Sequence, residues 1–139
     1  MKRIDVLLTS EPADGSAPFA HGDLEVLFHR WSRTSQLPLI EGALWAFVDL
    51  VLPDISGLEV CRRLRVDPLT AQAHVTMVLD ENDAEIRRRV LRAGADDYMA
   101  GPVTRAAVLD RVLAARPAEV DPGVLRTIAV GELTVDPAA

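Results

Sequence analysis

Leu44-Trp45-Ala46-Phe47-Val48-Asp49-Leu50-Val51-Leu52-Pro53-Asp54-Ile55-Ser56-Gly57 is the stretch that decides the fold. It opens with a continuous apolar run, which is typical of a central strand buried on both faces. Asp49 follows where that strand should end, and Pro53 and Gly57 turn the chain. Apolar residues at positions 58, 61 and 64 then predict an amphipathic helix over residues 57–65, with Ser56 as its N-cap.

Asp49 is a candidate for a functional site because of its place in this pattern. In open α/β sheets the chemistry occurs at the carboxyl ends of the strands. The alternative is that Asp49 only caps the turn, and position alone does not separate the two interpretations.

Composition limits the class of protein. The chain has 139 residues, of which 49% are hydrophobic and 26% charged, which fits one soluble globular domain with a real core. Its net charge of −6 argues against a nucleic-acid surface here. Cys61 is the only cysteine and is expected to be an inert core thiol. No signal peptide or membrane span is predicted, so we expect a cytoplasmic protein.

Strands and helices are expected to alternate along the chain. We expect strands at 4–9, 24–28, 44–49, 74–79 and 97–100. After the helix at 57–65, a second helix should pass through Ile86, Val90 and Ala93 and end at Gly94, and a third should span 104–115. Such alternation predicts an α/β fold with a doubly wound parallel sheet.

Two segments carry a family resemblance. Residues 48–61 resemble the phosphoacceptor segment of bacterial response-regulator receiver domains, and residues 92–103 resemble the segment from their fourth helix to the start of their fifth. The spacing between the two segments also fits that family. The resemblance implies a five-stranded, flavodoxin-like sheet of strand order 2-1-3-4-5. Only residues 10–23 separate the first two strands, so the first helix of the family should be degenerate.

The resemblance also implies what a working site contains. Asp49 matches the phosphoacceptor, Val51 the residue whose carbonyl binds the metal, and Tyr98 the aromatic residue through which the switch is detected. The family uses an acidic pair after strand one to bind Mg²⁺, a Thr or Ser at the end of strand four, and a Lys after strand five.

Most of these partners are replaced in this sequence. Thr9 and Ser10 stand at the acidic pair, with Glu11 next to them, while Leu79 replaces the Thr and Gly101 the Lys. We therefore expect an atypical receiver without a tight metal site, at most a weak Mg²⁺ site. Its ligands, if any, would be Glu11, Asp49 and Val51. No other cofactor is expected.

The end of the chain resembles the segment by which OmpR/PhoB-type regulators enter their winged-helix domain. We therefore assign residues 1–116 to the receiver and residues 117–139 to a linker and the start of a winged-helix DNA-binding domain. The alternative is a flexible tail.

Two functions from different classes follow from this pattern. The first is a non-enzymatic module of a transcription regulator that signals by dimerisation, either independently of phosphorylation or with a small ligand as its signal. The second is a phosphoacceptor phosphorylated at Asp49 by a histidine kinase. An Asp-nucleophile phosphohydrolase is a weaker third idea, because Val51 stands where that class has a second Asp. DNA would be bound only through the C-terminal effector domain.

The family's dimer implies further site residues. OmpR/PhoB-type receivers pair through their fourth helix, fifth strand and fifth helix. By that resemblance Asp97 and Arg111 would form an ion pair across a two-fold axis, and Arg87 or Arg89 supplies the basic residue of the fourth helix. The alternative is that these residues are merely solvated. We also expect residues 13–22 to form a loop or at most one helical turn, with Phe19 and Trp31 covering the sheet where the first helix is missing.

Overall fold

The computed structural model describes residues 2–31, 44–81 and 83–115. The chain divides into two units, residues 1–109 and residues 110–139. The second unit contributes only residues 110–115 to the described part, so the predicted linker and winged-helix start at 117–139 lie outside it. The sheet and the candidate site both belong to the first unit.

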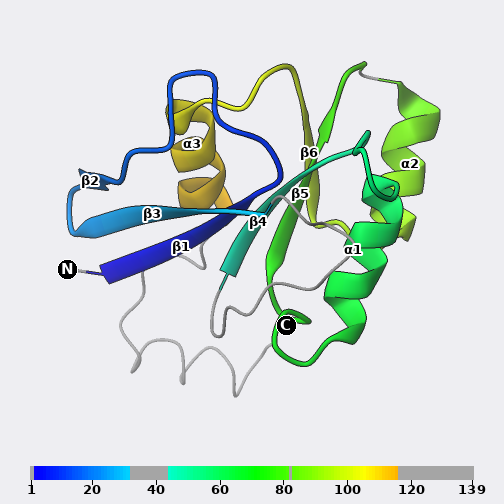
Figure 1. The fold of residues 1–139 in the computed structure, drawn as a ribbon, viewed down its shortest axis with the longest axis horizontal. Helices are drawn as coiled ribbons and strands as arrows, with labels where there is room; N and C mark the ends of the chain where they lie inside the picture. The colour runs from blue at the N-terminus through cyan, green and yellow to red at the C-terminus, as the bar shows by residue number, and fades with distance from the viewer. Residues whose placement is uncertain (1, 32–43, 82, 116–139) are drawn as a thin grey trace, which may run out of the picture. The chain divides into compact units, whose positions relative to one another are not determined.

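The described residues form six strands and three helices (Figure 1). In chain order they are β1 (Lys2–Leu8), β2 (Phe19–His21), β3 (Leu24–Arg30), β4 (Leu44–Asp49), α1 (Gly57–Val66), β5 (His74–Leu79), α2 (Ala84–Arg92), β6 (Asp97–Ala100) and α3 (Arg105–Ala115). No helix in these ranges is long and apolar enough to cross a membrane.

The strands form one sheet in the order β2-β3-β1-β4-β5-β6. The strands from β3 to β6 are parallel, and their order corresponds to the predicted order 2-1-3-4-5. The predicted number of five strands is wrong, because β2 adds an antiparallel strand beside β3. Between β1 and β2, within the described range 2–31, the chain forms turns and extended segments and no helix, as expected from its glycines and prolines. The expectation of a loop over residues 13–22 is wrong at residues 19–21, which form β2 by pairing with β3.

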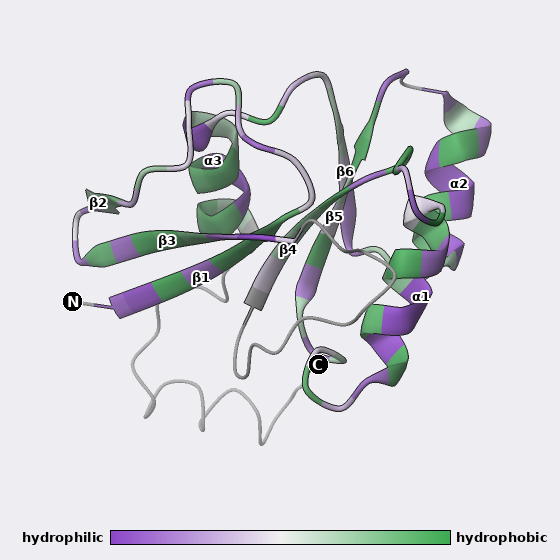
Figure 2. Cartoon of the chain, viewed as in Figure 1, coloured by the Kyte–Doolittle hydropathy of each residue, from purple (hydrophilic) through white to green (hydrophobic). Residues whose placement is uncertain are grey.

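One face of the sheet carries the larger core, beneath α1 and α2. α1 packs against β4, and α2 packs against β6. In Figure 2 both helices show hydrophilic residues beside hydrophobic ones, as expected for helices with one buried side. The buried residues of this core come from the sheet, the helices and their connections: Leu7, Trp31, Ala46, Val48, Val60, Cys61, Leu64, Ala73, Val75, Met77, Leu79, Val90, Ala93 and Ala95.

The opposite face of β1 lies where the family's first helix would pack. Side chains alternate between faces along a strand, so Val6, which is fully buried, points away from the core of Leu7. Phe28 pairs with Val6 in register, and the Phe19 ring lies 6.0 Å from the Phe28 ring. Phe19 thus lies on the predicted face of the sheet, beside Phe28 of β3, and its covering of β1 stays a prediction. The same prediction for Trp31 is wrong, because Trp31 is buried in the core beneath α1 and α2.

Local signals set the starts of the helices. The Ser56 hydroxyl accepts a hydrogen bond from the backbone N–H of Glu59 at 3.2 Å, which confirms the predicted N-cap of α1. Asp83 caps α2 in the same way, by accepting from Glu85 N at 2.7 Å. Cys61 is fully buried, and this burial raises the pKa of its thiol above the ordinary value. Burial confirms the predicted core position of Cys61, and a raised thiol pKa disfavours the reactive thiolate.

Candidate functional site

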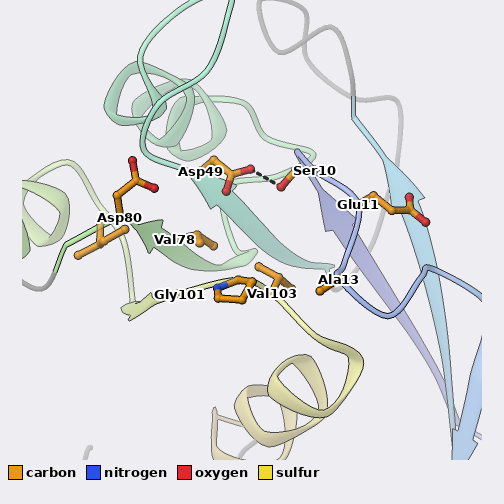
Figure 3. Close-up of a pocket in the computed structure, with 10 residues that line it drawn as sticks. Ser10, Glu11, Ala13, Asp49, Val78, Asp80, Gly101 and Val103 are labelled. Carbon is orange, nitrogen blue, oxygen red and sulfur yellow. Dashed lines mark hydrogen bonds between the residues drawn. The ribbon is translucent and has the colours of Figure 1, made fainter.

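A cavity of about 370 Å³ lies at the carboxyl ends of the parallel strands, where the fold predicts a site. Asp49, the last residue of β4, stands at its edge (Figure 3). The residues that line the cavity come from the loop after β1, the ends of β4 and β5, and the turn after β6. They are Ser10, Glu11, Ala13, Asp49, Val78, Leu79, Asp80, Gly101, Pro102 and Val103.

Two hydroxyl groups hold the carboxylate of Asp49. Thr9 Oγ1 donates a hydrogen bond to Asp49 Oδ2 at 2.7 Å, and Ser10 Oγ donates to the same oxygen at 2.6 Å. Thr9 Oγ1 also accepts a bond from the backbone N–H of Asp49 at 2.9 Å. The residues at the positions of the acidic pair are thus hydrogen-bond donors to Asp49. Among the described ranges, Asp49 Oδ1 has no hydrogen-bond partner.

Glu11 does not join Asp49. Its carboxylate accepts a hydrogen bond from Ser16 Oγ at 2.8 Å and lies 3.6 Å from a guanidinium nitrogen of Arg30. In Figure 3 Glu11 and Asp80 lie on opposite sides of Asp49. The structure therefore brings Thr9 and Ser10 to Asp49 but leaves Glu11 engaged elsewhere.

These donors do not fit a magnesium site. Mg²⁺ prefers carboxylate and water oxygens in octahedral geometry. Here the hydroxyls of Thr9 and Ser10 donate their hydrogen bonds to Asp49, and the Glu11 carboxylate is hydrogen-bonded elsewhere. Within residues 2–31, 44–81 and 83–115 no group of three or more His, Cys, Asp or Glu side chains is placed to hold a metal. Val51 follows Asp49 with a side chain that is 73% exposed, and the role of its carbonyl stays a prediction.

Among the residues that the structure describes, the lining of the cavity offers no cation to bind a phosphoryl group. These lining residues include three carboxylates and no Lys, Arg or His. Gly101, at the position of the family's Lys, has a backbone φ of +89°, a conformation that costs an L side chain about 1–2 kcal/mol. Leu79, at the position of the family's Thr, is buried in the core, and its side chain has no hydrogen-bonding group. Its backbone carbonyl accepts a hydrogen bond from Gly101 N at 3.3 Å.

The predicted switch and dimer residues lie on α2, β6 and α3. Tyr98 packs at the border of the core, and the Arg87 guanidinium lies 5.8 Å from the centre of its ring, within range of a cation–π interaction. Arg89 lines a second cavity of about 210 Å³ together with Leu50, Ser56, Leu58, Ile86 and Val90. Asp97 Oδ1 accepts a hydrogen bond from the backbone N–H of Tyr98 at 2.8 Å.

Sequence reasoning missed Asp14. Its Oδ1 accepts a hydrogen bond from the backbone N–H of Arg105, the first residue of α3, at 2.9 Å. The neighbouring Ala13 donates through its backbone N–H to the carbonyl of Val103 at 2.8 Å. The Asp14-Gly15 pair signals a turn, but nothing in the sequence indicates a contact with a residue 91 positions away.

Comparisons with known proteins bear on the family and the fold of the chain. Residues 45–113 match the family model described as the response regulator receiver domain. The phosphate regulon transcriptional regulatory protein PhoB of Rhizobium meliloti is 39% identical over 67 residues, covering 48% of this chain and 30% of that protein. The transcriptional regulatory protein TrcR of Mycobacterium tuberculosis is 33% identical over 95 residues, covering 66% of this chain and 36% of that protein. The chain thus spans about a third of the length of both relatives.

A solved structure supports the fold. The two-component response regulator of Clostridium difficile superposes with a TM-score of 0.55 at 12% identity, over 82% of this chain and 94% of that one. At that identity the likeness concerns the fold alone.

Proposed function

The chain carries a response regulator receiver domain, and from this premise we propose that it is an atypical receiver that signals without phosphorylation of Asp49. On this proposal it is a cytoplasmic, non-enzymatic module of a two-component-type transcription regulator. DNA binding belongs to an effector domain outside the described residues. The relatives named above are transcriptional regulatory proteins, which supports this assignment.

The observation that carries the proposal is the hydrogen bonding of Asp49. Phosphoryl transfer to a carboxylate relies on positioning and on electrostatic stabilisation of the transferred group. Each charge-assisted hydrogen bond to that group contributes about 1.5–3 kcal/mol. Here Leu79 and Gly101 provide neither the hydroxyl nor the ammonium, and Thr9 and Ser10 both donate to one oxygen of the Asp49 carboxylate, Oδ2.

The first prediction is that this chain stays unmodified when it is incubated with acetyl phosphate and Mg²⁺. Intact-mass spectrometry of the wild type and Asp49→Ala should give no phosphate adduct in either protein, because the charge around the carboxylate is not neutralised. A receiver that has the acidic pair, the Thr and the Lys, treated in the same tube series, is the positive control.

The opposite result has a clear meaning. A Mg²⁺-dependent adduct on the wild type that is lost in Asp49→Ala would overturn the proposal and establish the phosphoacceptor alternative, with a histidine kinase as partner. The double variant Thr9→Asp/Ser10→Asp tests the cause, since it restores the carboxylates at the metal positions. An adduct in this variant alone would identify the missing acidic pair as the reason for the lost activity.

A further inference from the structure

We propose that residues 9–14, called here the strap, link the Asp49 carboxylate to the N-terminus of α3. The output of the domain then passes along the strap, and not through a pairing of Tyr98 with a hydroxyl on β5. The link itself does not depend on whether Asp49 is phosphorylated. Its role in signalling does rest on the proposed function, in which α3 leads toward the effector domain.

One end of the strap is fixed at Asp49. Thr9 and Ser10 donate to Asp49 Oδ2 at 2.7 and 2.6 Å, and Asp49 N donates back to Thr9 Oγ1 at 2.9 Å. Thr9 is buried, so its hydroxyl has little water to replace these partners. Three hydrogen bonds therefore set the position of the first two residues of the strap relative to β4.

The other end is fixed at the start of α3. Ala13 N donates to Val103 O at 2.8 Å, and Asp14 Oδ1 accepts from Arg105 N at 2.9 Å. The first N–H groups of a helix have no partner inside the helix, and Asp14 satisfies one of them from a distant part of the chain. A carboxylate there also interacts favourably with the helix dipole. The Arg105 side chain lies 3.8 Å from the same carboxylate.

The strap and the turn after β6 face each other across the cavity. Ser10, Glu11 and Ala13 form one wall, and Gly101, Pro102 and Val103 form the other. The Ala13–Val103 hydrogen bond joins the two walls directly. A ligand or substitution that takes Asp49 Oδ2 away from the two hydroxyls therefore frees one end of a segment whose other end binds the first N–H of α3.

The route through Tyr98 lacks its partner. Leu79 offers no hydroxyl at the end of β5, and the Arg87 guanidinium lies over the Tyr98 ring. A movement of Tyr98 toward β5 would gain no hydrogen bond from Leu79. Among the described residues, the strap is the segment that joins Asp49 to a helix end by hydrogen bonds at both of its ends.

Amide hydrogen exchange of the ¹⁵N-labelled 139-residue chain tests this link. Two variants free the strap at Asp49: Asp49→Ala and, separately, Thr9→Val/Ser10→Ala. In both, the amides of Ala13 and Arg105 should exchange about tenfold faster, because the free energy of local opening at these amides falls by about the net contribution of one hydrogen bond. The Glu59 amide, capped by Ser56, is the internal reference. Thr9→Ser keeps the hydroxyl and should behave as the wild type. So should Asp54→Ala, which changes an exposed acid in the turn after β4.

The reverse experiment uses reciprocity, because coupling between two sites must act in both directions. Asp14→Ala should speed exchange of the Asp49 amide, whose acceptor is Thr9 Oγ1. Asp14→Asn should restore the wild-type rate, because the amide of Asn keeps an oxygen that can accept from the backbone N–H of Arg105. Unchanged exchange at Arg105 in both Asp49-side variants would overturn the link, and so would an equal rise at Glu59, which signals general destabilisation. A phosphate adduct on Asp49 would overturn the proposed function while leaving this result intact.

Discussion

Gly57 is the residue on which the turn after Asp49 depends. A Cβ atom at this position would lie 2.2 Å from the carbonyl oxygen of Asp49 and 2.9 Å from Leu50 Cα, so it would meet backbone and not a flexible side chain. The backbone N–H of Gly57 also donates to Leu50 O at 2.9 Å. The turn can therefore close against the end of β4 only if residue 57 has no side chain.

We predict that Gly57→Ala lowers the free energy of unfolding by about 3 kcal/mol, because the turn must move off β4 to admit the methyl group. Urea denaturation measures the loss. Gly15→Ala is the matched control: it has open space around the new Cβ and a φ of +92°, so it should cost only the backbone strain, about 1 kcal/mol. Equal losses in the two variants would contradict the proposed clash.

Asp5 connects two neighbouring strands, β1 and β3, through His29. His29 Nε2 lies 2.8 Å from Asp5 Oδ1, and Arg3 Nε donates to the same oxygen at 3.0 Å. Partial burial raises the pKa of the Asp5 carboxyl, but the hydrogen bonds and charges of His29 and Arg3 outweigh it. The net pKa lies below the ordinary value of 3.8.

This direction fixes the sign of a pH effect. A carboxyl with a lowered pKa in the folded state adds stability above its unfolded pKa and loses it as the pH falls through the folded value. The wild type should therefore be more stable than Asp5→Asn, and this difference in unfolding free energy should have its full value at neutral pH and decrease below pH 3.8. Because the partners are partly exposed, we expect about 1 kcal/mol or less. Denaturation curves at several pH values measure it, with Asp54→Asn as control, and a difference independent of pH would contradict the assignment.

At the scale of elements, periodicity predicted the parallel strands, and the caps predicted where α1 begins. Two errors had signals that were available. Gly22-Asp23 joins β2 to β3 as a two-residue hairpin loop, a pair known for such turns. Trp31 comes directly after β3 and three positions after Phe28. Because side chains alternate with a period of two, this odd spacing places Trp31 on the opposite face from Phe28.

The hydrogen bonds of the site could not be predicted in this way. The sequence indicated that Thr9 and Ser10 replace an acidic pair, but not that both hydroxyls point to one oxygen of Asp49. That geometry depends on how β1 and β4 pair in space and on side-chain rotamers, neither of which follows from spacing. The Asp14–Arg105 contact could not be predicted from the sequence for the same reason.

At the scale of the whole molecule, the predicted homodimer remains a proposal. It would use α2, β6 and α3, with Asp97 and Arg111 paired twice across a two-fold axis. Each exposed pair contributes only about 0–1 kcal/mol, so the pairs would set register more than affinity.

Sedimentation of the wild type, Arg111→Glu and the Asp97→Arg/Arg111→Asp swap tests this dimer. We expect the single variant to lose the dimer through like-charge repulsion and the swap to recover it. If all three sediment alike, these residues do not pair between subunits, and any dimer uses another surface.

The added strand β2 has a consequence for association between copies. It pairs with residues 24–26 and so covers the first part of the β3 edge, which would otherwise offer unpaired backbone groups to a neighbouring molecule. β2 spans only Phe19–His21, so the edge that it presents itself is three residues long, and residues 27–30 of β3 lie beyond its pairing. Short edge strands are a common protection against edge-to-edge aggregation. Among the described strands, the β2–β3 hairpin thereby divides this side of the sheet into two short steps, residues 19–21 and 27–30, in place of one straight edge on which intermolecular sheets could grow.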